Sequence, residues 1–202
     1  MNKKAQSTIT FDTLSKEDIN SGTGEFHASW NDAIYPRVLS GTPQAILDIG
    51  CGTGAFLARF SPLPDLILAG VDISSGMIQT AKERLGQRAD LRTGDSEALP
   101  WPDASFDTIT CIASFHHYPN PMMAFREIYR VLRPRGQVVL ADILLPTPIR
   151  QAANALLPFI KTGDVHFYSR QEISAMARQA GFSTPEWNPI SENGFWMVTK
   201  KL

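Results

Sequence analysis

Three aspartates and a run of alternating glycines are the residues of this chain best suited to hold a ligand. Asp48 stands just before Gly50-Cys-Gly-Thr-Gly54, and Asp72 and Asp95 follow further along the chain. Glycine allows a positive φ and lets a ligand lie against the backbone. Carboxylates accept charge-assisted hydrogen bonds, which orient a bound group. Together these residues predict a site for a nucleotide-type ligand.

Two adjacent histidines, His116 and His117, are the candidates for acid–base chemistry. An imidazole changes its protonation state near neutral pH, so either side chain is a candidate general base. His166 and Tyr168 are further candidates. A packing and hydrogen-bonding role for the adjacent pair explains the same pattern, and both interpretations stay open.

The two cysteines, Cys51 and Cys111, lie in the glycine run and in an apolar segment. This placement is typical of small apolar side chains, and it argues against a disulfide framework or a metal site. We therefore expect no metal ion in this protein.

The elements that must position these residues alternate between strands and helices. Apolar segments with the length and residue types of buried strands lie at residues 45–49, 66–71, 89–93, 106–113 and 137–145. Helical segments lie between them, at residues 55–60, 75–85 and 121–132. Strands that are apolar on both faces and alternate with helices form a parallel sheet covered on both sides. Such sheets bind cofactors at the carboxyl ends of their strands, where the three aspartates and the histidines lie.

The end of the chain follows a different pattern. Ser169 and Glu172 form a capping box that opens a helix closing at Gly181. Residues 184–190 and 195–200 then form a hairpin of two strands. We expect an α/β fold with a doubly wound, mostly parallel sheet and an antiparallel C-terminal strand.

The bulk properties indicate one ordinary globular domain. The chain has 202 residues, of which 43% are hydrophobic, and a net charge of -1. This charge gives no global attraction to nucleic acid or to anionic membranes. No segment approaches the roughly 18 apolar residues of a membrane span, and the polar N-terminus lacks a signal peptide's apolar core, so we expect a cytoplasmic protein. Its expected parts are a helical lid (1–40), a cofactor-binding core (45–145), a cover segment (146–168), and a final helix with a strand hairpin (169–202).

The glycine run alone leaves two cofactor classes open. Residues Gly50 to Ala55 also satisfy the dinucleotide pattern G-x-G-x-x-G/A, with Asp72 at the spacing of a ribose-binding acid. Asp48, however, would repel a pyrophosphate, whereas it would attract a sulfonium or an ammonium group. Asp95 and the closing hairpin also fit a dinucleotide enzyme poorly. These features favour a cationic, phosphate-free adenosine ligand over NAD.

Several motifs taken together resemble one family. The chain from about residue 45 to 145 is similar to the class I S-adenosylmethionine-dependent methyltransferases, in their type 11, small-molecule branch. The motifs that carry the resemblance are Leu47-Asp-Ile-Gly-Cys-Gly-Thr-Gly54, Gly70-Val-Asp-Ile73 with Met77, Gly94-Asp-Ser-Glu-Ala-Leu-Pro100, Phe106-Asp107, Phe115-His-His-Tyr118 and Glu127-Ile-Tyr-Arg-Val-Leu-Arg-Pro-Arg-Gly136. The resemblance implies a Rossmann-like, seven-stranded sheet.

The resemblance also implies a role for each residue of the cofactor site. Asp48 and the turn residues Gly50, Cys51, Gly52 and Gly54 would hold the methionine part of S-adenosylmethionine. Asp72 would bind the ribose hydroxyls, and Asp95, with the Ser96 backbone beside it, would accept a hydrogen bond from the adenine amino group. The remaining cofactor contacts would come from Ile73, Met77 and Ala113.

The implied activity is methyl transfer to a small-molecule acceptor by in-line displacement, with S-adenosylhomocysteine as product. The catalytic candidates are His117 and His116, which follow the fourth strand. The segment there lacks the Asn/Asp-Pro-Pro-aromatic run of enzymes that methylate base or amide nitrogens, and no Pro-Cys pair for attack on cytosine is present. We therefore expect no nucleic-acid partner. A non-catalytic S-adenosylmethionine-binding protein and an NAD-dependent oxidoreductase remain alternatives, and the oligomeric state is left open.

Overall fold

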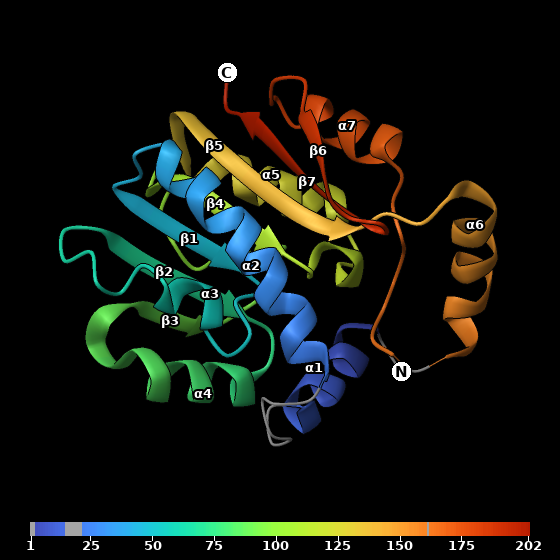
Figure 1. Ribbon diagram of the computed structural model, residues 1–202, viewed down its shortest axis with the longest axis horizontal. Helices are drawn as coiled ribbons and strands as arrows, with labels where there is room; N and C mark the ends of the chain where they lie inside the picture. Colours follow the sequence, from blue (N-terminus) through green and yellow to red (C-terminus); the bar gives the residue numbers. More distant parts are fainter. Residues whose placement is uncertain (1–2, 15–21, 161) are drawn as a thin grey trace.

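The computed structural model describes residues 3–14, 22–160 and 162–202, and the side chains of residue 14 and residues 22–28 lie outside that description. Its centre is one seven-stranded sheet with the order β3-β2-β1-β4-β5-β7-β6 (Figure 1). The strands are β1 (Ala45–Ile49), β2 (Ile67–Asp72), β3 (Asp90–Thr93), β4 (Phe106–Ile112), β5 (Leu132–Ile143), β6 (Glu186–Ser191) and β7 (Gly194–Lys200). Strands β1 to β5 pair in parallel, and β7 runs antiparallel to both of its neighbours. The predicted fold class is confirmed.

Helices cover both faces of the sheet. The α-helices are α1 (Lys3–Leu14), α2 (Gly22–Ser40), α3 (Ala55–Ala58), α4 (Ser75–Leu85), α5 (Pro121–Val131), α6 (Thr147–Leu156) and α7 (Arg170–Gln179), and the short 3-10 helices are η1 (Gly86–Arg88), η2 (Phe115–His117) and η3 (Leu157–Phe159). One apolar cluster joins α2, α3 and α4 to one face of the sheet, and a second joins α5 and α7 to the other face. Figure 1 shows the first group in front of the sheet and α5 behind it.

Capping residues define where the helices begin. Ser74 accepts a hydrogen bond from the Met77 amide and caps α4. Asn120 caps α5 ahead of Pro121, which needs no amide partner at that position. The capping box predicted at Ser169 is confirmed. These caps fix the points at which the chain leaves each strand end and turns back along the sheet.

The observed strand limits differ from the predicted ones mainly at β5. We expected a helix to residue 132 and a strand over residues 137–145, but β5 begins at Leu132 and ends at Ile143. Leu132 already has an extended backbone and pairs with Phe106, so the helix passes into the strand without a loop. Arg135 has a positive φ of 66°, which accommodates the irregular pairing between Phe106 and Thr108.

The N-terminal helix α1 lies at the edge of the sheet where β1 and β2 end, close to the beginning of α4 (Figure 1). Of the predicted lid, residues 1–2 and 15–21 lie outside the described residues. Among the helices that are described, none combines the length and apolar character needed to cross a membrane.

Candidate functional site

A cavity of about 250 Å³ opens at the carboxyl ends of β1, β2 and β4. We call the part lined by the glycine turn and the strand-end acids Asp48 and Asp72 the glycine end, and the part lined by His117, with Phe11 of α1 packed against it, the histidine end. Helix α1 contributes Lys4, Ser7 and Phe11, so it closes the cavity from the outside. Of the residues predicted for the site, all line this cavity except Gly54, His116, His166 and Tyr168.

Main-chain hydrogen bonds hold the glycine turn in a conformation that glycine favours. Gly50 and Gly52 have φ values of 72° and 51°. The amides of Gly50 and Cys51 both donate to the Val71 carbonyl of β2, at 2.8 and 3.0 Å. A Cβ on Gly50 would lie 2.5 Å from the Cβ of Ser114, whereas a Cβ on Gly52 would meet no atom within 4 Å. The turn is therefore packed at Gly50 and open to the cavity at Gly52.

Gly54 contributes to packing. It caps α3 in the left-handed conformation. A Cβ at this position would lie 2.9 Å from Leu85 Cδ1 and 3.1 Å from Ala81 Cβ. Gly54 thus lets α4 approach α3 closely, and it positions the turn from behind the cavity.

Asp48 is a buried carboxylate at the end of β1. Its side chain accepts a hydrogen bond of 2.6 Å from Thr110 of β4. Burial, opposed in part by the Thr110 bond and reinforced by the nearby Asp72, raises the pKa of Asp48 to about 7. A cation in the cavity would favour its charged form.

Asp72 accepts two main-chain hydrogen bonds that join neighbouring turns. Its carboxylate oxygens lie 2.9 Å from the Gly52 amide and 2.9 Å from the Ser74 amide. Burial raises the pKa of Asp72, and these two bonds work in the opposite direction. Neither Asp48 nor Asp72 forms an ion pair with another described residue.

Asp95, by contrast, is paired with a cation. Lys4 Nζ of α1 lies 2.6 Å from Asp95 Oδ2 and 2.7 Å from Glu97 Oε2. The other oxygen of Asp95 accepts a hydrogen bond of 2.9 Å from the Glu97 amide. Asp95 therefore faces the cavity and also anchors α1 over it.

The residues that follow β4 form another part of the cavity wall. Ala113 has a φ of 51°, an uncommon conformation for a residue with a Cβ. Next to it, Ser114 Oγ donates to the Ile49 carbonyl at 3.0 Å and lies 3.0 Å from Tyr118 Oη. These buried bonds tie the end of β4 to the end of β1.

Cys51 and Cys111 are buried free thiols, and burial raises the pKa of each.

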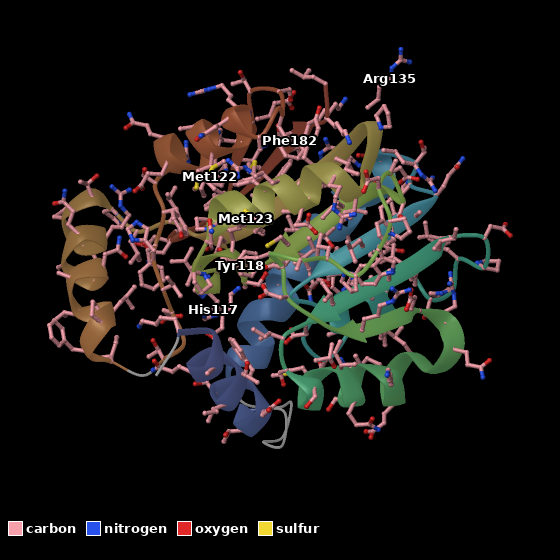
Figure 2. The ribbon with its side chains drawn as sticks, turned by 180° about the vertical axis from the view of Figure 1, so that it is seen from behind. His117, Tyr118, Met122, Met123, Arg135 and Phe182 are labelled. Atoms are coloured by element: carbon pink, nitrogen blue, oxygen red, sulfur yellow. The ribbon has the colours of Figure 1, made fainter. Side chains whose placement is uncertain are left out.

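His116 and His117 lie side by side in η2 but in different surroundings. Figure 2 shows His117 next to α1, and the ring of Phe11 packs edge-on against it with a centroid distance of 4.9 Å. Burial and the neighbouring His116 lower the pKa of His117 to about 4. His116 does not line the cavity, and its Nδ1 lies 2.6 Å from Asp142 Oδ1. Burial lowers the pKa of His116, but Asp142 and Asp164 outweigh burial and raise it.

Several residues of the site were not predicted. Lys4, Ser7 and Phe11 follow the i, i+3, i+7 spacing of one helix face, a signal that was available in the sequence. Asp142 and Asp164 come from β5 and from a loop, and no local pattern marks either of them. Of the described residues in the predicted cover segment 146–168, none lines the cavity.

Comparisons with known proteins place this geometry among methyltransferases. A family model described as "Methyltransferase domain" matches residues 47–140. The chain is 34% identical over 154 residues to a 27-O-demethylrifamycin SV methyltransferase of Amycolatopsis mediterranei, covering 73% of this chain and 57% of that protein. It is 30% identical over 180 residues to a demethylmenaquinone methyltransferase of Thermotoga maritima, covering 82% of this chain and 76% of that protein.

The fold is shared more widely than the sequence. The crystal structure of the cyclase SpnF matches with a TM-score of 0.72 at 18% identity, covering 92% of this chain and 85% of that chain. This likeness is one of fold alone, and the same fold supports unrelated functions in different proteins.

Proposed function

Since this chain belongs to the class I S-adenosylmethionine-dependent methyltransferases of the type 11 branch, we propose that it binds S-adenosylmethionine in the cavity and transfers the methyl group to a small molecule. The observation that carries this proposal is the pair Asp48 and Asp72. Asp48 is buried and Asp72 is partly buried, both line the cavity, and neither is matched by a cation among the described residues. A buried charge needs a partner, and a ligand bearing a sulfonium and an ammonium group supplies one.

The positions of the cofactor-site residues support the roles that we assign to them. Asp48 and the turn residues Gly50, Cys51 and Gly52 hold the methionine part, since this end combines an acid with open backbone. Asp72 binds the ribose hydroxyls. Ile73, Met77, Asp95 and Ser96 line the cavity next to it and hold the adenine ring, and Ala113 contacts the cofactor from the end of β4. Gly54 acts through packing.

When bound, the cofactor supplies a methyl group on a good leaving group, so the protein mainly aligns the acceptor and excludes water. His117 and Phe11 line the histidine end, where the acceptor would bind. The depressed pKa of His117 keeps its imidazole neutral near pH 7, as a general base for a protonated acceptor must be. His116 is a positioning residue, because it lies behind the cavity wall.

Two alternatives use the same cavity. A protein that binds S-adenosylmethionine without catalysing methyl transfer would need only the glycine end of the cavity. An NAD-dependent oxidoreductase would place a pyrophosphate beside Asp48, which is unfavourable for two anions in a low-dielectric site.

The cofactor assignment is tested by thermal unfolding with S-adenosylhomocysteine and, separately, with NAD. At about 100 times its dissociation constant, a ligand adds roughly 2.7 kcal/mol to the free energy of unfolding. We expect this stabilisation from S-adenosylhomocysteine and none from NAD. Stabilisation by NAD alone would overturn the proposal.

The activity is tested by incubating the protein with methyl-labelled S-adenosylmethionine and a metabolite extract, followed by a panel of hydroxylated aromatic and quinol acceptors. The panel follows the names of the relatives, which specify O-methylation or a quinone substrate. We expect label in a small molecule, with reduced transfer by the His117→Gln variant. Binding of the cofactor without transfer to any acceptor would favour the non-catalytic alternative.

A further inference from the structure

Three side chains near the histidine end of the cavity have nitrogen and oxygen atoms that lie close together. Asp164 Oδ1 lies 3.4 Å from His116 Nε2 and 3.3 Å from His117 Nδ1. One nitrogen from each histidine and one carboxylate oxygen of Asp164 all lie within 4.8 Å of one another. Asp164 belongs to the loop before α7, which Ser7 of α1 anchors through a 3.1 Å hydrogen bond to the Gly163 carbonyl.

These separations are long for hydrogen bonds. A charge-assisted bond between an imidazole nitrogen and a carboxylate usually spans about 2.7–2.9 Å. His117 Nδ1 is buried and makes no hydrogen bond of normal geometry within the described part of the chain. A buried nitrogen without a partner is unfavourable.

The same separations suit ligands of one metal ion. Bonds of about 2.0–2.1 Å in a tetrahedral site place neighbouring donor atoms about 3.3–3.4 Å apart. Both distances from Asp164 match this edge length. The two histidine donors lie no more than 4.8 Å apart, and rotation of one ring about its side-chain bonds shortens that edge.

The surroundings of His116 match those of a metal ligand. Asp142 Oδ1 lies 2.6 Å from His116 Nδ1, and Asp142 Oδ2 accepts a 3.0 Å bond from the His116 amide. With its proton on Nδ1, His116 has a free lone pair on Nε2, directed toward Asp164. Phe167 stacks on His116 and Phe11 packs against His117, so apolar rings surround the cluster.

We propose that His116, His117 and Asp164 bind one divalent transition-metal ion of the zinc type, with Asp142 orienting His116. Two imidazoles and a carboxylate are ligands that such ions accept, and three protein ligands leave a further position open. His117 also lines the cavity, so the ion would sit at its edge. No local sequence pattern predicts this site, because Asp164 is remote from the histidines in the chain. The inference does not depend on methyl transfer.

The test is metal binding by the protein without an affinity tag. Purified apoprotein is titrated with Co²⁺, followed by its visible d–d absorption, and the bound Co²⁺ is then displaced with Zn²⁺. We expect one equivalent of Co²⁺ with the intense absorption of a four-coordinate ion, and no thiolate-to-metal charge-transfer band. Failure of wild-type protein to take up one equivalent of either ion overturns the proposal.

Matched variants locate the ion. We expect Asp164→Asn and His117→Ala to abolish the four-coordinate spectrum, and Asp142→Asn to weaken binding by about 10–100-fold. His166→Gln is the control: its ring lies 3.3 Å from Asn154 Nδ2 and 3.4 Å from Glu172, outside the cluster, so binding should be unchanged. Thermal unfolding shows which variants remain folded. A folded Asp164→Asn protein with an unchanged Co²⁺ spectrum overturns the assignment, even if His117→Ala does not fold.

Discussion

The two ends of the cavity are built from different kinds of chain segment. At the glycine end, Asp48 and Asp72 follow the adjacent strands β1 and β2, and main-chain bonds within the sheet fix the turn between them. At the histidine end, η2 meets α1 and the loop before α7, and Ser7 bonds to Gly163 across 156 positions of sequence. The first end depends on the sheet, and the second depends on contacts between remote segments.

This difference has a functional consequence. A binding site fixed by the sheet keeps its geometry as long as the core is folded. A site assembled from remote segments can open locally at a lower free energy. We therefore expect changes at the glycine end to alter cofactor affinity, and loss of the contact between Ser7 and Gly163 to alter acceptor binding without affecting the cofactor.

The largest effect is expected from Asp48→Asn. The carboxyl has a pKa of about 7 in the folded protein, against an ordinary aspartate pKa of 3.8. Because folding favours the protonated form, this group lowers the free energy of unfolding as pH rises from about 4 to about 7, by about 4 kcal/mol in full. Asparagine cannot ionise and still accepts the Thr110 hydrogen bond. The variant should therefore gain about 3 kcal/mol over wild type between pH ~5 and pH ~8.

The measurement is denaturant unfolding at both pH values, with the exposed Asp65→Asn variant as control. Asp65→Asn should follow wild type at each pH. The same Asp48→Asn protein should bind S-adenosylhomocysteine more weakly, and the loss should be greater at the higher pH. Parallel pH dependence in Asp48→Asn and wild type would show that Asp48 does not titrate in this range.

The Asp72→Ala substitution should remove most of the roughly 2.7 kcal/mol stabilisation that S-adenosylhomocysteine gives at about 100 times its dissociation constant. The variant loses the proposed ribose contact and leaves the Gly52 and Ser74 amides without their acceptor. We expect the protein to remain folded. Thermal shift with and without ligand measures the effect, and Asp65→Ala should behave as wild type. An unchanged ligand-induced shift would refute the ribose assignment.

The sequence predicts the glycine end of the cavity better than the histidine end. The glycine end could be predicted because Asp48, Gly50 and Gly52 lie in one short segment, and strand ends converge in a parallel sheet whatever follows them. The fold class is confirmed for the same reason, since apolar runs mark each buried strand. The role of Gly54 required the structure, because its closeness to Ala81 and Leu85 depends on how α4 packs.

The histidine end could not be predicted in the same way. Asp164 approaches His116 and His117 only after the chain has passed through β5 and α6, and periodicity says nothing about that path. The separate environments of the two histidines also depend on burial and on Asp142, which lies on β5. The face of α1 formed by Lys4, Ser7 and Phe11 has helical spacing, but nothing local indicates which surface it covers.

The Gly52→Ala substitution should distinguish backbone strain in the glycine turn from weaker binding of the ligand. Gly52 has a φ of 51° and open space at the Cβ position, so alanine there costs about 1–2 kcal/mol of backbone strain. Gly86→Ala is a control outside the cavity lining: Gly86 also has a positive φ of 55° and open space at the Cβ position, but its ψ of -131° lies outside the left-handed helical region, so we expect a larger loss of stability there than at Gly52. Both variants should lose about 2–4 °C in melting temperature per kcal/mol. We expect only Gly52→Ala to bind S-adenosylhomocysteine more weakly, and equal binding by the two variants would contradict the proposed cradle.

The Ser7→Ala substitution should give the smallest effect, and it should act only on the histidine end of the cavity. The variant loses the 3.1 Å bond to the Gly163 carbonyl, worth about 1 kcal/mol, and so loosens α1 from the loop that carries Asp164. Thr8→Val is the control, because the Thr8 hydroxyl bonds only to the Lys4 carbonyl within α1. With an acceptor in hand, Ser7→Ala should raise the KM for that acceptor several-fold while the affinity for S-adenosylhomocysteine stays unchanged. If cofactor affinity falls as much as acceptor affinity, α1 belongs to the cofactor site as well, and the two ends of the cavity are not independent.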